Sequence, residues 1–286
     1  QGHAHRHGCG TGTTPRAASP QPASRVPTAP GPRLLGALLE AGTDDDVWGT
    51  YHERIVALVR ELVESNGDLL EELLLSLQDA LEGNEWPPKR LRLAAVAACA
   101  EVLPDALNAA LQREELEALL VKGTRDADSH SSRRFAITAL SHLREATPAV
   151  VEVLLKASQD VRLVQADAVK AAARFRHLSE TFSYEDSLTP LAEALTGPSG
   201  ARAYVAAQLL AALGSSPAAL EVPGLRERIA AILADALRQP NAEREVYLDK
   251  ELEWGYAWGY AVEIEPQGPL SQALFAALVK IWGLPE

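Results

Sequence analysis

Residues 160–175, the stretch that decides the fold, read DVRLVQADAVKAAARF. Apolar side chains recur in it at steps of three and four, which places them on one face of a helix. They are Val161, Val164, Ala168, Ala171 and Phe175. Asp160 stands where an N-cap residue is expected, with its carboxylate at the positive end of the helix dipole. The stretch therefore predicts an amphipathic helix that begins just after Asp160.

A second helix is predicted immediately before this one. Thr147 and Pro148 provide the usual N-cap and first position of a helix. Its apolar stripe consists of Val151, Leu154 and Leu155. The two helices form an antiparallel hairpin, and Thr189-Pro190 predicts the opening of a related hairpin 42 residues after Thr147.

An arginine lies near the start of the second helix in each expected hairpin. These arginines are separated by 36, 43, 29 and 40 residues, and they are Arg54, Arg90, Arg133, Arg162 and Arg202. Three of them are followed four residues later by an alanine, namely Ala94, Ala166 and Ala206. Small residues suit a helix that must contact its own partner and both neighbouring repeats. We expect the arginines to fix the stacking of adjacent repeats, by binding an acid or a helix-end carbonyl, rather than to form a ligand-binding ladder.

Periods near 40 residues with two helices per unit are typical of stacked helical repeats. Over roughly residues 44–238 the chain resembles HEAT repeats. That resemblance implies an all-α fold, a right-handed α-α superhelix. We expect three regions: a disordered tail rich in Gly, Pro and Arg at residues 1–33, a HEAT-repeat α-solenoid at 34–240, and a C-terminal cap at 241–286 with an aromatic segment and a final helix.

The charge distribution restricts the classes of partner. The whole chain has a net charge of -12, and residues 1–33 contain four arginines and no acid, so residues 34–286 have a net charge of -12 - 4 = -16. An acidic body repels phosphate backbones, so we expect a neutral or basic protein partner and no nucleic acid.

No apolar run is long enough to span a bilayer, which predicts no membrane insertion. Two cysteines suggest no disulfide framework and favour a reducing cytoplasm. The chain begins with Gln1 and contains no methionine, which suggests a fragment of a larger protein or a processed product.

Two groups of residues are candidates for partner binding. Lys89, Arg90 and Arg92 form the densest basic cluster of the body, although such clusters are more often solvated helix starts. Residues 253–265 read EWGYAWGYAVEIE and alternate aromatic residues with Gly or Ala. The aromatic candidates are Trp254, Tyr256, Trp258 and Tyr260.

An extended conformation places these four rings on one face, whereas a helix is weakened by the two glycines. The segment is either a stacking platform for a peptide or ligand, or a cap over the exposed end of the solenoid. We favour the cap.

The sequence gives little support for catalysis. It contains no P-loop, no His-Glu-x-x-His motif and no Gly-x-Ser-x-Gly motif. His3, His5, His7 and Cys9 have metal-ligand chemistry, but they lie in the expected tail, which has no second shell to orient them. We expect no catalytic residue, no metal site and no cofactor.

A second resemblance concerns the C-terminal part of the chain. The segments IAAILADAL at 229–237, REVYL at 244–248 and LSQALFAAL at 270–278 are similar to the end of the HEAT solenoids attached to bacterial NACHT-type (STAND) signalling ATPases. This resemblance implies a sensor or autoinhibitory role and no nucleotide hydrolysis, because the ATPase module is missing. The leading hypothesis is a non-catalytic protein-interaction scaffold or sensor. The alternative is a HEAT-like small-molecule-binding enzyme of the chromophore-lyase type, with Cys99 as its nameable nucleophile.

Overall fold

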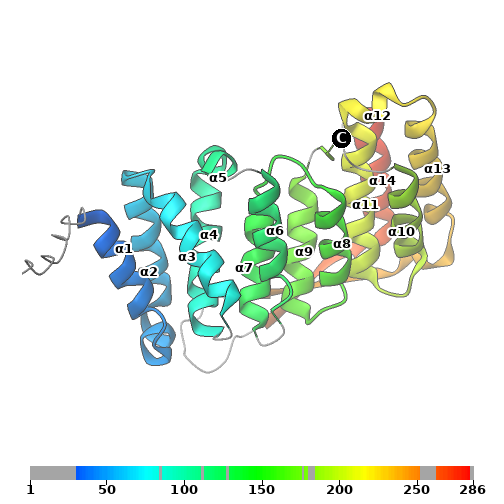
Figure 1. Ribbon diagram of the computed structural model, residues 1–286. Coiled ribbons are helices and arrows are strands. Elements are labelled where there is room, and N and C mark those ends of the chain that lie inside the picture. The colour runs from blue at the N-terminus through cyan, green and yellow to red at the C-terminus, as the bar shows by residue number, and fades with distance from the viewer. Residues whose placement is uncertain are drawn as a thin grey trace, which may run out of the picture.

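The computed structural model describes residues 30–83, 86–110, 113–126, 129–175, 177–179, 184–251 and 262–283. Most of these residues form helices that stack as hairpins in sequence order and give an elongated body (Figure 1). The fold is therefore the all-α solenoid that the repeat pattern predicts.

The main helices lie in two layers, which we call A and B. The A layer contains α1 (Pro30–Ala41), α3 (Leu69–Glu82), α6 (Arg113–Gly123), α8 (Pro148–Ala157), α10 (Tyr184–Thr196) and α13 (Leu225–Leu237). The B layer contains α2 (Asp45–Ser65), α4 (Trp86–Val102), α7 (His130–Leu140), α9 (Arg162–Arg174), α11 (Gly200–Ser215) and α14 (Leu270–Trp282). Shorter elements join them: α5 (Pro104–Ala110), α12 (Pro217–Glu221) and the 3-10 helix η1 (Pro240–Glu243). Each B helix packs against the next along the stack, so the B layer is a continuous ladder.

Residues between α13 and α14 form an antiparallel β-hairpin of β1 (Glu245–Glu251) and β2 (Val262–Pro269). A bulge near Val246 interrupts the register between Glu245 and Tyr247. Because α14 packs against both α11 and α13, it is the last helix of the ladder, and the β-hairpin is an insertion within the last helical pair. The division at residue 240 expected from the sequence thus falls inside that pair.

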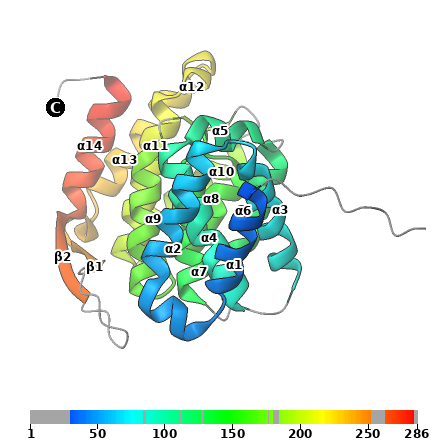
Figure 2. The same ribbon diagram turned by 90° about the vertical axis from the view of Figure 1, so that its left-hand side faces the viewer.

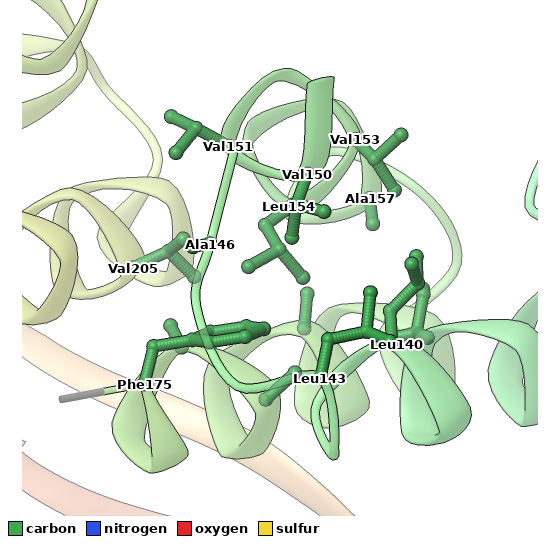
Figure 3. Packing of buried hydrophobic residues seen from close by; sticks show 14 of the residues in the cluster. Leu140, Leu143, Ala146, Val150, Val151, Val153, Leu154, Ala157, Phe175 and Val205 are labelled. Carbon is green, nitrogen blue, oxygen red and sulfur yellow. The ribbon is translucent and has the colours of Figure 1, made fainter. Parts of the chain in front are cut away.

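The hairpin of α8 and α9 confirms most of the local predictions. The N–H of Val150 donates to the Thr147 hydroxyl across 3.4 Å, so Thr147 is the N-cap and Pro148 the first residue of α8. Phe175 closes α9 and lies in the core with Leu143 and Leu154, among side chains from α7, α8 and α11 (Figure 3). These residues belong to a single buried cluster that runs through the stack.

Four local predictions were wrong. Val161, expected on the apolar face of α9, is exposed and is the N-cap residue in place of Asp160. The Asp160 carboxylate instead binds Arg133 and accepts a hydrogen bond from the adjacent Val161 N–H. The solenoid helices begin at Pro30 rather than Leu34. Arg54 lies in the middle of α2, not near its start.

The fourth wrong prediction is the helix start at Thr189-Pro190. Here α10 begins at Tyr184 and contains Pro190 in its interior. A proline removes the hydrogen bond to the carbonyl four residues earlier, which belongs to Asp186. Both residues are exposed, so water can satisfy that carbonyl and the helix continues.

Candidate functional site

The candidate site is the B-helix face, by which we mean the side of the B layer that points away from the A layer. At the C-terminal end of the stack this face is covered by the β-hairpin, because β1 packs across α9 and α11 (Figure 2). The sequence of α11 explains why. Its described side chains are buried almost all round, and the partly exposed ones are Arg202, Tyr204, Gln208 and Ser215. A helix that is apolar on every side must be covered on every side.

The β-hairpin is fixed to the stack at its base. Arg244 donates from Nη1 to the carbonyl of Gly197 across 2.6 Å and from Nη2 to that of Leu195 across 3.2 Å, so it caps the C-terminal end of α10. Burial lowers the pKa of the Arg244 guanidinium. Next to it, the buried Val246 lies over Gly200, where its Cγ2 is 3.6 Å from the position of an added Cβ. These contacts hold the start of β1 on α11.

Further towards the N-terminus, α4 and α7 carry stripes of partly exposed side chains that helical spacing places on one face of each helix. The α4 stripe consists of Arg90, Ala98 and Glu101, beside the buried Ala94, and the α7 stripe consists of Ser131, Phe135 and Thr138. His142 follows this stripe in the turn after α7. The α7 stripe lies opposite the buried Ala136, Ile137 and Leu140. Ala98 leaves little side-chain bulk on this side of α4, so a bound chain could approach the helix closely beside Phe135.

A polar cluster joins the C-terminal ends of α4, α7 and α9. Arg174 lies 2.7 Å from His142 Nε2 through its Nη1, which also donates to Ser141 Oγ across 3.0 Å. Asn108 of α5 donates to the His142 carbonyl across 3.2 Å. Burial and the positive charge of Arg174 lower the pKa of His142, against a weaker opposing effect of Glu101. His142 therefore favours its neutral form, which can accept the hydrogen bond from Arg174.

Of the arginines near helix starts, Arg133 has the predicted structural role of binding an acid in the adjacent repeat. Arg133 binds the Asp160 carboxylate through two nitrogens, at 2.7 and 2.8 Å, and donates to the Asp126 carbonyl at 2.8 Å. Its neighbour Arg134 binds Asp167 of α9 at 2.6 Å. Burial favours the neutral carboxyl of Asp160, but the hydrogen bonds from Arg133 and the Val161 amide outweigh it and lower the pKa of Asp160. Arg134 was missed in the sequence, although the Arg-Arg doublet is visible there.

The three predicted basic residues of α4 do not share one surface. Arg90 belongs to the α4 stripe of the B-helix face. Arg92, two residues on, points elsewhere and donates to Ser76 Oγ of α3 across 2.7 Å and to the Pro88 carbonyl across 3.1 Å. Burial is the main cause that lowers the pKa of Arg92. Lys89 is half-buried beside them.

The other predicted site residues, Trp254, Tyr256, Trp258 and Tyr260, lie outside the described residues. The strand that precedes them, β1, runs along the B-helix face and contacts α11 and α9. Sequence analysis did not single out Arg174, His142 or Arg244, because no local pattern marks them; their partners come from other helices.

Cys99 is a poor nucleophile in this fold. Its thiol is fully buried, and burial raises its pKa to about 12, so the reactive thiolate is scarce at neutral pH. Among the described residues, no group of three or more His, Cys, Asp or Glu side chains is arranged to hold a metal ion. In the same part of the chain, none of the helices combines the length and apolar character needed to cross a membrane.

Comparisons with known proteins agree with the architecture. No protein-family model and no curated protein matches the chain. Among solved structures, an engineered protein aligns with a TM-score of 0.51 at 17% identity, covering 87% of this chain and 96% of that one. A second engineered protein aligns with a TM-score of 0.50 at 17% identity, covering 87% and 98%. A designed armadillo repeat protein, solved in complex with the peptide (KR)4, aligns with a TM-score of 0.47 at 17% identity, covering 86% and 91%. At these identities the first two likenesses show the fold alone, and that fold is a helical repeat solenoid.

Proposed function

We propose that the chain is a non-catalytic protein-interaction scaffold that binds a segment of a protein partner on the B-helix face of α4 and α7. The observation that carries the proposal is the pair of neighbouring stripes on these helices. The small, partly exposed Ala98 on α4 leaves room for a peptide backbone, and the half-buried ring of Phe135 on α7 offers an apolar anchor beside it.

The partner segment is neutral or basic. The chain has a net charge of -12, which attracts cations and repels phosphate backbones, so a nucleic acid is a poor candidate. On the site itself, Glu101 ends the α4 stripe with an exposed carboxylate close to His142. A lysine or arginine of the partner would bind there, and affinity should fall at higher salt.

A finer part of the proposal concerns the setting. The sequence pattern of residues 229–278 resembles solenoids of NACHT-type signalling ATPases, so we infer a sensor module that reports partner binding to a larger signalling protein. A free, buried Cys99 is compatible with a reducing cytoplasm, where we place the protein.

Site-specific photocrosslinking tests the proposal. A photoreactive phenylalanine analogue replaces Thr138 on the α7 stripe, and in a matched control it replaces the exposed Glu152 on α8 in the A layer. We expect a covalent adduct with a protein partner from position 138 and none from position 152. The substitutions Phe135→Ala and Glu101→Arg should each reduce the yield of that adduct.

Adducts of equal yield from both positions, or from Glu152 alone, would place the partner elsewhere. Loss of the adduct in Phe135→Ala counts only if that variant keeps its helical signal and melting temperature. The conservative variant Phe135→Leu controls for packing, because it keeps an apolar side chain at this half-buried position.

A further inference from the structure

The last helix of the ladder is apolar on two sides. One side of α14 is buried against α11 and α13 and consists of Leu270, Ala273, Leu274, Ala277 and Ile281. A second row, Phe275, Val279 and Trp282, recurs at steps of four and three and so shares another face. We call this row the tail stripe. Phe275 is 62% exposed and Trp282 45% exposed, and the guanidinium of Arg226 stacks 5.0 Å from the centre of the Trp282 ring.

An exposed apolar row on the last described repeat differs from scattered surface residues. In an internal B helix such as α11, the equivalent side is buried by the next helical pair. A helix that is apolar on all sides is normally covered, and contiguous exposed apolar patches mark interaction sites. The tail stripe is therefore a surface to which another helical pair can be added.

The first helical pair offers the matching surface. On α2, Ile55, Val59 and Val63 face the core, whereas Tyr51 is 55% and Leu58 42% exposed on another side. Tyr51 and Leu58, which we call the head stripe, lie seven residues apart. Phe275 and Trp282 are also seven residues apart. The two residues of each stripe are therefore separated by about 10.5 Å along the helix axis.

Charge adds a second match. Arg33 lies in the first turn of α1 and Glu227 in the first turn of α13, and both are exposed. Arg33 is the fourth residue of α1 and Glu227 the third residue of α13, so both lie at the same end of an A helix. If one copy of the stack continues into the next, A helix lies beside A helix in the same direction, and Arg33 of one copy meets Glu227 of the other. Leu34, which is also exposed, then lies near Trp282.

We propose that the protein binds a second copy of itself head to tail: the tail stripe on α14 of one copy packs on the head stripe on α2 of the next, and the ladder of B helices continues across the junction. The contact uses two different surfaces, so it does not close on itself. Each dimer retains a free head and a free tail, and the mean assembly size grows with protein concentration.

Sedimentation velocity of the full chain over a hundredfold range of micromolar concentrations measures the assembly. We expect the mass to rise from that of a single chain, 30.7 kDa, to multiples of it. The tail variant Phe275→Glu/Trp282→Glu and the head variant Tyr51→Glu/Leu58→Glu should each remain a single chain at all concentrations. All four positions are exposed, so both variants should fold, which circular dichroism melts will check.

The decisive sample is a mixture of the two variants. Only one junction can then form, between an intact tail and an intact head, so we expect a species of two chains and none larger. Glu227→Arg should weaken the assembly, and Arg33→Glu in the same chain should restore it. As a control, Leu75→Glu, exposed on α3 away from both ends, should leave it unchanged.

Three results would overturn the proposal. A wild type that stays a single chain at every concentration has no such junction. A head variant that still forms dimers pairs tail to tail instead. A mixture of the two variants that stays at the mass of one chain shows that the stripes do not meet.

Discussion

Arg133 and Arg134 are adjacent in the chain, yet each binds a carboxylate at a different point of the next hairpin. Consecutive residues of a helix point about 100° apart, so one side chain reaches the turn before α9 and the other reaches its middle. Two such contacts fix both the position and the rotation of α9 relative to α7. The apolar surfaces of the two helices alone would tolerate small rotations.

The Arg133–Asp160 pair predicts an acid-sensitive contribution to stability. The pKa of Asp160 is lower in the folded protein than in the unfolded chain, so its stabilisation is complete above the unfolded value of about 4 and is lost as pH falls through the folded value. Asp160→Asn should lower the free energy of unfolding by about 1–3 kcal/mol at neutral pH. Urea titrations at several pH values should show that acidification lowers the free energy of unfolding less in this variant than in the wild type.

The control for this variant is Asp235→Asn. Asp235 pairs with Arg238 at 2.6 Å, but both side chains are more than 70% exposed, so the change should be within about 0.5 kcal/mol. Equal losses for the two variants would mean that the bidentate geometry at Asp160 adds nothing.

The alanines of the repeat pattern make a second prediction at this scale. Ala166 and Ala206 are buried, as their position after the helix-start arginines implied. Ala166→Leu and Ala206→Leu should each lower the free energy of unfolding by about 1–3 kcal/mol, because extra methylenes force neighbouring helices apart. Ala173→Leu, exposed on the same helix as Ala166, should change it little. Denaturant midpoints that are unchanged at both buried sites would contradict the close packing.

Among the elements, the β-hairpin depends on a few contacts at its base. Two strands alone are marginal in water, so the hairpin needs the face of α11 and the arginine that fixes it there. Arg244→Ala should lower the free energy of unfolding by about 1–3 kcal/mol, because two charge-assisted hydrogen bonds are lost. Amide hydrogen exchange in β1 should speed up more than in α8.

Arg244→Lys should rescue this loss only in part, because an ammonium cannot reach both carbonyls in the geometry of the guanidinium fork. Arg238→Ala removes an exposed arginine nearby and serves as the control. If β1 exchanged at the wild-type rate in Arg244→Ala, the packing of Val246 alone would hold the hairpin.

The aromatic residues that follow β1 remain a prediction at the scale of the element. If they act as a cap, Trp258→Ala should cost about 3–5 kcal/mol of stability. If they act as a recognition platform, the variant should keep its melting temperature and lose its partner. Thermal melts combined with binding to the crosslinked partner decide between the two, and we expect the melt to change.

For the whole molecule, stacking in sequence order gives an elongated body, because each pair contacts only its neighbours (Figure 1). Small-angle scattering should give a radius of gyration well above the roughly 19 Å expected for a globular chain of 286 residues. It should be measured at low concentration, or on the tail variant, so that assembly does not add to it. A value near 19 Å would contradict the solenoid.

The sequence alone determined the architecture and much of the local structure. Apolar spacing, the Thr-Pro helix start and alanines at fixed distances from arginines are local signals, and they correctly predicted the α8–α9 hairpin and the buried Ala94, Ala166 and Ala206. Such signals act within one or two turns of helix, which is why they can be read along the chain. The Thr-Pro signal wrongly predicted a helix start at Pro190, because the residues before it are already helical and α10 continues through the proline.

Only the tertiary structure decided which surfaces are covered. The β-hairpin lies on α9 and α11, about 40 to 80 residues away along the chain, and no local pattern reports such a contact. The partners of Arg134, Arg174 and Arg244 likewise lie in other helices or just after their ends, at distances set by the stacking. The same holds for the tail stripe: Phe275 looks like an ordinary core residue in the sequence, and it is exposed because the ladder of described helices ends at α14.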